Sequence, residues 1–334
     1  MSNPLSRLLE ERGRLVADGG MGTSLFELGL QTGSTPELWN VEHADRVAKV
    51  HQGFIEAGAD IILTNTFGGT AARLDLDGLG HRVAELNAAG VKLAREVADL
   101  ADRQVIVAGS VGPTGQLFEP LGELTHERAM ALFSEQMEAL EAAGADLLWI
   151  ETLSSIEELA AAVAAGALTG LAMVTTMSFD THGKTMMGVP PSSLASWWRS
   201  QDVGPAAVGA NCGIGPADVV AAAAGIKSAD PELVVVAKGN CGIPKMIDGK
   251  LWYPTSSDDM FAYAELALDA GATIIGACCG SVPDHIAQIR AVVDNHPLAD
   301  FSIEAVETRL GPVSPPEVSA RREGRNRRGR ARVG

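Results

Sequence analysis

The sequence predicts an α/β protein of the (β/α)8 TIM barrel class, and three observations support this. Short apolar runs rich in β-branched residues alternate with amphipathic stretches of roughly ten to twenty residues, the pattern of a parallel sheet with helical crossovers. Eight such units occupy about 280 residues, close to the usual size of this barrel. Aromatic residues make up only 4% of the chain, whereas 37 residues are Gly. We expect the strands at residues 15–18, 60–65, 105–110, 146–151, 172–177, 207–212, 233–238 and 273–279.

The amphipathic stretches carry their own boundary signals. The stretch 125–144 opens at Thr125, an N-cap residue, followed three positions later by Arg128 rather than by the acid of a capping box. Gly58, Gly144 and Gly271 each stand just before an expected strand, where a left-handed glycine can end a helix. These repeated devices favour modular βα units.

A doubly wound sheet is the rival architecture. It would carry a phosphate-binding loop after the first strand, but "DGGMGT" at 18–23 does not match GxGxxG and no Walker lysine follows. We therefore predict a barrel spanning residues 1–305. Beyond it, residues 306–334 lose the helical period and are rich in Pro and Arg, so we expect a disordered tail.

Charge and cysteine usage limit the class of protein. The formal net charge of −16 argues against a nucleic-acid-binding body, although residues 321–334 carry seven Arg and one Glu. No run reaches the roughly 20 apolar residues of a membrane helix, and no signal peptide is evident. Four cysteines in 334 residues are not a secreted disulfide framework. We expect a cytoplasmic protein with reduced thiols and no membrane or nucleic-acid partner.

The expected strand topology brings three cysteines together as a candidate metal site. Cys212 closes one expected strand and Cys278–Cys279 close another, and the carboxyl ends of barrel strands form one rim. Three thiolates suit Zn2+, and a catalytic zinc keeps three protein ligands with an open fourth position. The alternative without a metal is that the cysteines are small apolar residues buried in the core. Asn240 and Cys241 are both candidates to complete the set, Asn240 as a weak oxygen ligand and Cys241 as a fourth thiolate.

An open zinc with three thiolates is a poor activator of water but can hold a substrate thiol as a thiolate. That sulfur can then displace an activated alkyl group in line. No Ser/His/Asp triad is apparent in the sequence, which agrees with such chemistry.

Six motifs resemble those of the homocysteine S-methyltransferases, a family that includes betaine–homocysteine methyltransferase and the homocysteine-binding module of cobalamin-dependent methionine synthase. They are "DGGMGT", "AGADIILTNTF", "AGSVGPTG", "NCGIGP", "GNCGIP" and "GACCG", in order between about residues 10 and 290. The resemblance implies a barrel with catalytic zinc that forms methionine from homocysteine. It also implies that Cys212, Cys278 and Cys279 are the ligands, that Asn240 fills the vacant position without substrate, and that Cys241 lies beside the metal.

The resemblance also assigns the substrate-binding groups. Asp18 and Glu151 match the carboxylates that bind the homocysteine ammonium, and both end expected strands. The amides of Gly19 and Gly20 would bind the substrate carboxylate. Read alone, the sequence Asp18–Gly19–Gly20 is equally a tight turn, and Glu151 a solvated strand end.

The methyl donor is less well specified. Betaine-type relatives enclose the quaternary ammonium with aromatic rings, and the matching places here supply Trp39 and Phe67 but have Gly68 and Thr152 where rings are expected. The length of the chain and the segment 178–188 resemble those of bacterial relatives assigned to betaine or other onium donors, and this resemblance favours a small onium donor such as betaine. The alternative is the homocysteine-activating subunit of a split cobalamin-dependent methionine synthase, with a corrinoid protein as partner.

Several readings stay open. His182 is a candidate catalytic base, but a His-Gly pair between polar residues is typical of a turn, which is the interpretation we favour. "SWWRS" at 196–200 suits an oligomer interface or, as we favour, plain packing, so a homo-oligomer is not excluded. Two competing classes are a zinc-holding partner subunit without turnover of its own and a barrel with structural zinc bound by all four cysteines.

Overall fold

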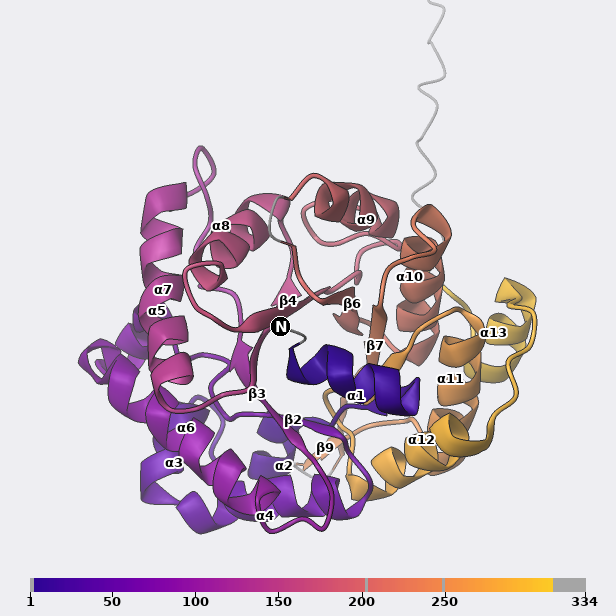
Figure 1. The fold of residues 1–334 in the computed structure, drawn as a ribbon, viewed down its shortest axis with the longest axis horizontal. Helices are drawn as coiled ribbons and strands as arrows, with labels where there is room; N and C mark the ends of the chain where they lie inside the picture. Colours follow the sequence, from indigo (N-terminus) through magenta and orange to yellow (C-terminus); the bar gives the residue numbers. More distant parts are fainter. Residues whose placement is uncertain (1–2, 202–203, 248–249, 315–334) are drawn as a thin grey trace, which may run out of the picture.

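Eight parallel strands form a single sheet that closes into a barrel in the computed structural model, which describes residues 3–201, 204–247 and 250–314 (Figure 1). The order is β1-β10-β7-β6-β5-β4-β3-β2, and a parallel bridge between Ala17 and Ile61 joins the first strand to the last. The expected TIM barrel is confirmed. The strands are β1 (Leu15–Val16), β2 (Ile61–Leu63), β3 (Ile106–Val111), β4 (Leu147–Leu153), β5 (Ala172–Met177), β6 (Ala207–Cys212), β7 (Val235–Gly239) and β10 (Ile274–Ala277).

Helices surround the barrel on its outside (Figure 1). The α-helices are α1 (Pro4–Arg12), α2 (Met21–Glu27), α3 (Trp39–Glu42), α4 (Ala44–Glu56), α5 (Ala71–Leu74), α6 (Val83–Ala98), α7 (His126–Ala142), α8 (Ile156–Gly166), α9 (Pro191–Arg199), α10 (Pro216–Ala229), α11 (Ser257–Asp269), α12 (Pro283–Asn295) and α13 (Ile303–Leu310). Short 3-10 turns are η1 (Pro36–Leu38), η2 (Asp75–Asp77) and η3 (Gly80–Arg82).

The two faces of each strand enter two different cores, because successive side chains of a strand point to opposite sides. Trp149 and Val236 belong to the cluster inside the barrel, whereas Leu148 and Val235 pack outward against the helices. Helix α1 crosses the amino-terminal mouth of the barrel (Figure 1), and its buried Leu5 and Leu8 complete the inner cluster. The amino-terminal mouth is therefore closed by apolar packing.

Every expected strand matches a strand of the structure, with boundaries shifted by a few residues. The helix signals also hold: Thr125 accepts a hydrogen bond from the amide of Arg128, and Gly58, Gly144 and Gly271 all have positive φ. The antiparallel hairpin β8 (Lys245–Ile247) and β9 (Lys250–Trp252) was not expected. Its strands have only three residues each, too few for an alternating pattern to stand out from a loop.

The expected boundary of the tail at residue 306 falls inside a folded element. Helix α13 runs from Ile303 to Leu310, and Val306 is fully buried against α10 and α11. The amide of Ser314 also donates to Asp218 (2.9 Å). The folded part thus continues past 305, while residues 315–334 of the expected tail lie outside the described residues.

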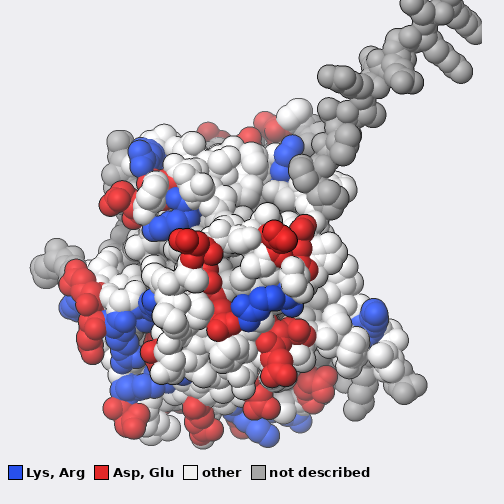
Figure 2. All heavy atoms as spheres, turned by 90° about the vertical axis from the view of Figure 1, so that its right-hand side faces the viewer, with Lys and Arg blue, Asp and Glu red and all other residues white. Residues whose placement is uncertain are grey.

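Acidic and basic side chains lie side by side on the face formed by the helices at the right of Figure 1 (Figure 2). An ion pair between Arg309 and Glu265 joins α13 to α11. Within the described ranges no helix combines the length and the hydropathy needed to cross a membrane.

Candidate active site

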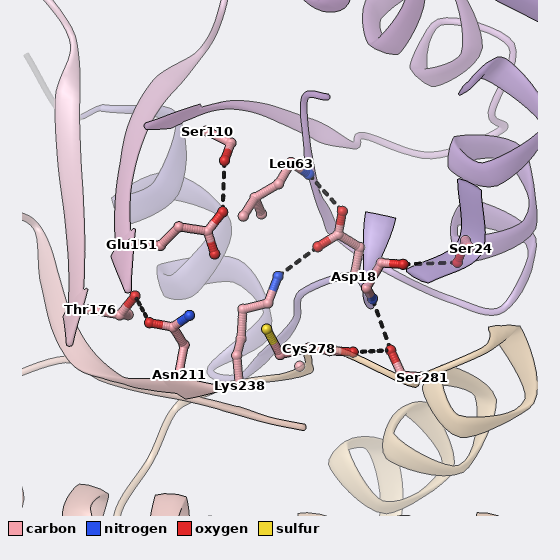
Figure 3. Close-up of polar contacts among 12 residues, drawn as sticks. Asp18, Ser24, Leu63, Ser110, Glu151, Thr176, Asn211, Lys238, Cys278 and Ser281 are labelled. Atoms are coloured by element: carbon pink, nitrogen blue, oxygen red, sulfur yellow. Dashed lines mark hydrogen bonds and ion pairs between the residues drawn. The ribbon is translucent and has the colours of Figure 1, made fainter. Parts of the chain in front are cut away.

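A cavity of about 530 Å3 opens at the carboxyl ends of the strands, the end at which TIM barrels place their chemistry. Its floor consists of inward-facing side chains from the last positions of several strands (Figure 3). These include Ser110, Glu151, Lys238 and Cys278, which follow the same alternation as the inner core. The cavity extends outward to residues 33–37 and 64–68.

The thiols of Cys212, Cys278 and Cys279 converge at one side of this cavity. Their sulfur atoms all lie within 4.8 Å of one another, and the described residues hold no other cluster of candidate metal ligands. The amide of Cys278 donates to the carbonyl of Gly239 (2.8 Å), which ties the segment after β10 to β7. Contact with Cys278 lowers the pKa of Cys212, but contact with Cys279 and burial outweigh this and raise it to about 12. Without a metal the three groups are therefore thiols at neutral pH.

Two residues at the rim adopt a left-handed backbone, which costs a non-glycine residue about 1–2 kcal/mol. They are Cys212 (φ 60°) and Thr152 (φ 63°). Asn211 links them: its Oδ1 accepts from the amide of Thr152 (2.9 Å) and from Oγ1 of Thr176 (2.7 Å). Strain of this kind is found where the surrounding structure fixes a functional side chain. Here it directs the Cys212 thiol toward Cys278 and Cys279.

Cys241 is buried and lies outside the three-thiol cluster. Its sulfur lies 3.5 Å from Nδ1 of His285, and its amide donates to the carbonyl of Cys279 (2.9 Å). Asn240 is also buried, and its Nδ2 donates to the carbonyl of Gly213 (2.6 Å) beside Cys212. The arrangement favours three thiols on a metal over four, with Cys241 and Asn240 supporting the ligand loops.

Of the two predicted carboxylates, Asp18 pairs directly with Lys238, whereas Glu151 is influenced only by the charge of that lysine. Nζ of Lys238 lies 2.7 Å from Oδ1 of Asp18, whose Oδ2 accepts from the amide of Leu63 (2.7 Å) (Figure 3). Oε1 of Glu151 accepts from Oγ of Ser110 (2.6 Å). Lys238 and Glu151 line the cavity, whereas Asp18 lies behind Lys238. The structure thus brings Asp18 and Glu151 to the same floor.

Burial raises the pKa of Asp18 and of Glu151, although Lys238 opposes this at both groups. Burial lowers the pKa of Lys238, but the charges of Asp18 and Glu151 outweigh it and keep that pKa above its usual value. When all three groups are ionised, the trio of Asp18, Glu151 and Lys238 has a net charge of −1. A buried surplus of this kind is stabilised when a cation enters beside it.

The glycines after Asp18 approach their neighbours closely. A Cβ on Gly20 would lie 2.7 Å from the carbonyl oxygen of Cys278, so any larger residue would displace the cysteine segment. The amide of Gly20 donates to Oγ of Ser281 (2.9 Å), which in turn donates to the carbonyl of Cys278 (2.7 Å). The Gly20 amide thus already has an acceptor, and both Gly19 and Gly20 line the cavity.

The outer part of the cavity contains one buried acid. Glu37 is 3% exposed and accepts from the amide of Gly68 (2.6 Å), and burial raises its pKa. Phe67 is the one aromatic side chain among the described lining residues. Trp39 does not line the cavity, because it is buried beneath Arg46, whose guanidinium lies 5.0 Å from the ring centre.

The segment 178–188 lies apart from this cavity, since none of its residues is among those that line it. His182 (φ 52°) and Gly183 (φ 72°) form the turn of a small bridge between Thr181 and Lys184. These observations favour the interpretation of His182 as a turn residue over its interpretation as a catalytic base. Trp197 of α9 is partly buried against the main core, which favours packing for "SWWRS".

The model of the homocysteine S-methyltransferase family matches residues 15–293, from the first strand of the barrel to α12. The chain belongs to this family. The resemblance that the six motifs indicate is thereby confirmed.

Similar solved structures and curated sequences agree with this family assignment. The metallated form of the homocysteine methyltransferase MmuM from Escherichia coli has a TM-score of 0.72 and 28% identity, over 86% of this chain and 99% of that one. Methionine synthases of Mycobacterium leprae and Mycobacterium tuberculosis are 28% and 29% identical over 84% of this chain. The chain spans only about a quarter of their length, 24% and 25% respectively.

Lys238, which lines the cavity and pairs with Asp18, was not among the residues expected from the sequence. It ends the expected strand 233–238 and stands two positions after Val236, an inward residue of the barrel. A lysine in the inward register at the carboxyl end of a barrel strand must lie at the active-site end. The signal was available from the alternation of this strand.

Proposed function

We propose that this protein is a zinc-dependent homocysteine S-methyltransferase that forms methionine with a small onium compound such as betaine as methyl donor. One observation supports it most: three thiols line the same cavity as Glu151 and Lys238, and Lys238 is paired with Asp18. The three thiols suit a metal that binds a substrate thiol, and the trio of Asp18, Lys238 and Glu151 suits the charged end of an amino acid.

The donor set fits zinc. Three cysteine sulfurs within 4.8 Å of one another are the soft ligands that zinc prefers, and the neighbouring cavity leaves space on one side. When bound there, zinc would hold the homocysteine sulfur as a nucleophilic thiolate near neutral pH. Asn240 is proposed to fill the free position in the absence of substrate, as the family resemblance implies.

The trio is proposed to bind the substrate ammonium. Because Lys238 already pairs with Asp18, the direct contact falls to Glu151, which lines the cavity. Asp18 acts through Lys238 by keeping that ammonium away from Glu151. The substrate cation then balances the surplus negative charge. The substrate carboxylate is proposed to lie at the Gly19 amide, since the Gly20 amide donates to Ser281.

Methyl transfer needs little further chemistry from the chain. The thiolate sulfur forms a bond to the donor methyl carbon while the bond from that carbon to the onium nitrogen or sulfur breaks. The electron pair of the broken bond stays on that nitrogen or sulfur, which loses its positive charge. No proton moves in this step. The chain's part is to place the two reactants in line and to exclude water, which alone can lower the barrier by about 7–11 kcal/mol.

A small cationic donor suits the outer cavity better than a corrinoid. The whole cavity has about 530 Å3, which is within the range that a small molecule fills. Glu37 offers a buried carboxylate to a cation and Phe67 a ring face. A complete aromatic cage is absent from the described lining, so the cation would be balanced mainly by charge.

The alternative is a homocysteine-activating subunit that meets a separate corrinoid protein. The observation in its favour is that the chain matches about a quarter of two much longer methionine synthases. In that case the donor would stay at the cavity mouth, and Glu37 would have no direct role.

One assay separates the two. The zinc-loaded protein is given homocysteine with betaine, S-methylmethionine or methylcobalamin in separate reactions, and methionine is measured. The proposal expects turnover with one of the two onium donors and none with methylcobalamin alone. Turnover with methylcobalamin only would favour the alternative, and failure of both onium donors, with zinc bound, would contradict the proposal.

A further inference from the structure

A second cavity of about 450 Å3 lies at the opposite, amino-terminal end of the barrel. The segments that form it all precede strands or cover that end: the end of α1, the turns before β2 and β3, and α12. Its lining residues are Arg12, Arg14, Gly58, Asp60, Arg103, Arg290, Val293 and Asp294. The three thiols and the Asp18–Lys238–Glu151 trio belong to the other end, so this cavity is separate from the proposed methyl transfer.

Asp60 organises the cavity but is itself fully engaged. Its side chain is 1% exposed, and Oδ2 accepts from the amide of Val16 (2.8 Å) and from Nη1 of Arg290 (2.9 Å). Oδ1 pairs with Arg12. A carboxylate with this many donors has little capacity left for another cation. Asp60 therefore fixes Arg12 and Arg290 in place.

The lining has more positive than negative charge. Four guanidinium groups face two carboxylates, and Asp294 is already paired with Arg290. Asp102 attracts Arg103 from beside it in the sequence but does not line the cavity. Several half-buried guanidinium groups close together are costly unless an anion balances them.

Two guanidinium N–H groups also lack an acceptor. Nη1 of Arg103 and Nε of Arg290 are buried without a hydrogen-bond partner, and Nη1 of Arg103 reaches Asp60 only at 3.9 Å. Burial lowers the pKa of Arg103, and the charges of Arg12 and Arg290 add to this, while Asp60 opposes it. Orphaned donors in a native site often indicate a ligand or water that the site is built to hold.

We propose that this cavity binds a phosphate group, either as free phosphate or as part of a small phosphorylated metabolite. Guanidinium groups offer paired N–H donors in the geometry that a tetrahedral oxyanion accepts. A doubly charged anion would balance the excess of arginine over carboxylate in the lining. The volume of about 450 Å3 exceeds the need of one phosphate and is within the range of small-molecule sites. No reactant of the proposed methyl transfer contains phosphate, so this site is additional to it.

The test uses isothermal titration calorimetry on the full chain at low ionic strength. Inorganic phosphate, glycerol 3-phosphate and ATP are titrated separately, with sodium chloride at matched ionic strength as reference. We expect saturable binding of a phosphate-bearing probe and none of chloride. Equal affinity for phosphate and its esters would identify free phosphate as the ligand, whereas tighter binding of an ester or of ATP would indicate a metabolite.

Substitutions locate the site. Arg103→Gln is expected to weaken binding at least tenfold, since it removes one charge and an orphaned donor. Arg14→Gln is a second variant that should disturb the fold less. The guanidinium of Arg14 donates to the carbonyl of His296 (2.9 Å) and does not pair with Asp60. The matched control is Arg82→Gln, whose arginine pairs with Glu85 on the exposed surface. Unchanged affinity in Arg14→Gln together with unchanged affinity in a folded Arg103→Gln would overturn the proposal, as would binding no stronger than that of chloride.

Discussion

Nζ of Lys238 and Oδ1 of Asp18 lie 2.7 Å apart, and the two side chains are 2% and 1% exposed. The pair joins β7 to the segment that follows β1, across β10, and Lys238 lines the cavity. Nζ also lies 5.4 Å from the ring centre of Trp149, whose strand carries Glu151. One ammonium group therefore pairs with Asp18 and places its charge near Glu151.

Lys238→Met should destabilise the protein strongly. It leaves two buried carboxylates without a cation, and the loss of one partner of a buried ion pair costs about 3–5 kcal/mol. Chemical unfolding of the purified variant measures the change. The control is the double variant Lys238→Met/Asp18→Asn, which removes both charges of the pair and should recover part of the lost stability. A single variant as stable as the parent would show that the ion pair contributes nothing.

Cys279→Ser and Cys241→Ala should differ in zinc affinity. Cys279 belongs to the three-thiol cluster, so its loss should reduce affinity by more than the roughly 10–100-fold that follows from changing a supporting residue. Cys241 contacts His285 and lies outside the cluster, so Cys241→Ala should keep one zinc per chain. Competition with a chromophoric chelator measures both. Equal loss in the two variants would instead favour a site closed by four thiolates.

Zinc binding should release about three protons per site near pH 7. Contact with Cys212 raises the pKa of Cys278 well above its usual value, and the pKa of Cys279 is raised as well. All three groups are thus protonated in the metal-free protein and must lose their protons to bind zinc. The affinity should fall with decreasing pH, by about tenfold per pH unit for each proton. Calorimetry in buffers of different ionisation enthalpy counts the protons, and a count near zero would mean that the thiols are not the ligands.

Most of the fold could be predicted from the sequence because barrel strands are uninterrupted apolar runs. Residues 105–109 and 233–237 are such runs, and the alternation of these runs with helical stretches along the chain gives the number and the order of the units. The same topology places Cys212 near Cys279, since the carboxyl ends of parallel strands meet at one rim. The strand topology could therefore predict the three-thiol cluster.

The details of the site were harder to predict, because they depend on contacts between distant residues. Asp18 and Lys238 are 220 positions apart in the sequence, and nothing local to either shows that they pair. The left-handed backbone of Cys212 depends in the same way on Asn211, which links to β4 and β5. Val306 shows a similar limit, since α13 is stabilised by packing against α10 and α11 more than by its own short pattern.

Glu37→Gln should weaken binding of an onium donor while leaving homocysteine binding nearly unchanged. Glu37 is the buried acid of the outer cavity, far from the Glu151 end that is proposed to bind the substrate ammonium. Removing one charge opposite a cation in a partly dry site should raise the KM for the donor about tenfold or more. Steady-state kinetics with each substrate varied in turn give the two KM values.

The pH dependence of the donor KM gives an independent check on the same residue. Burial raises the pKa of Glu37, although the amide of Gly68 and the charge of Arg73 oppose this. The carboxylate is charged above that pKa and neutral below it, so the donor KM of the parent should rise as the pH falls through a value above the usual one for glutamate. Glu37→Gln should lose this rise, whereas the control Glu27→Gln, at an exposed position of α2, should keep it. A parent enzyme with a pH-independent donor KM, or a Glu37→Gln variant with the parent's profile, would show that Glu37 does not bind the donor and would favour a donor presented at the cavity mouth.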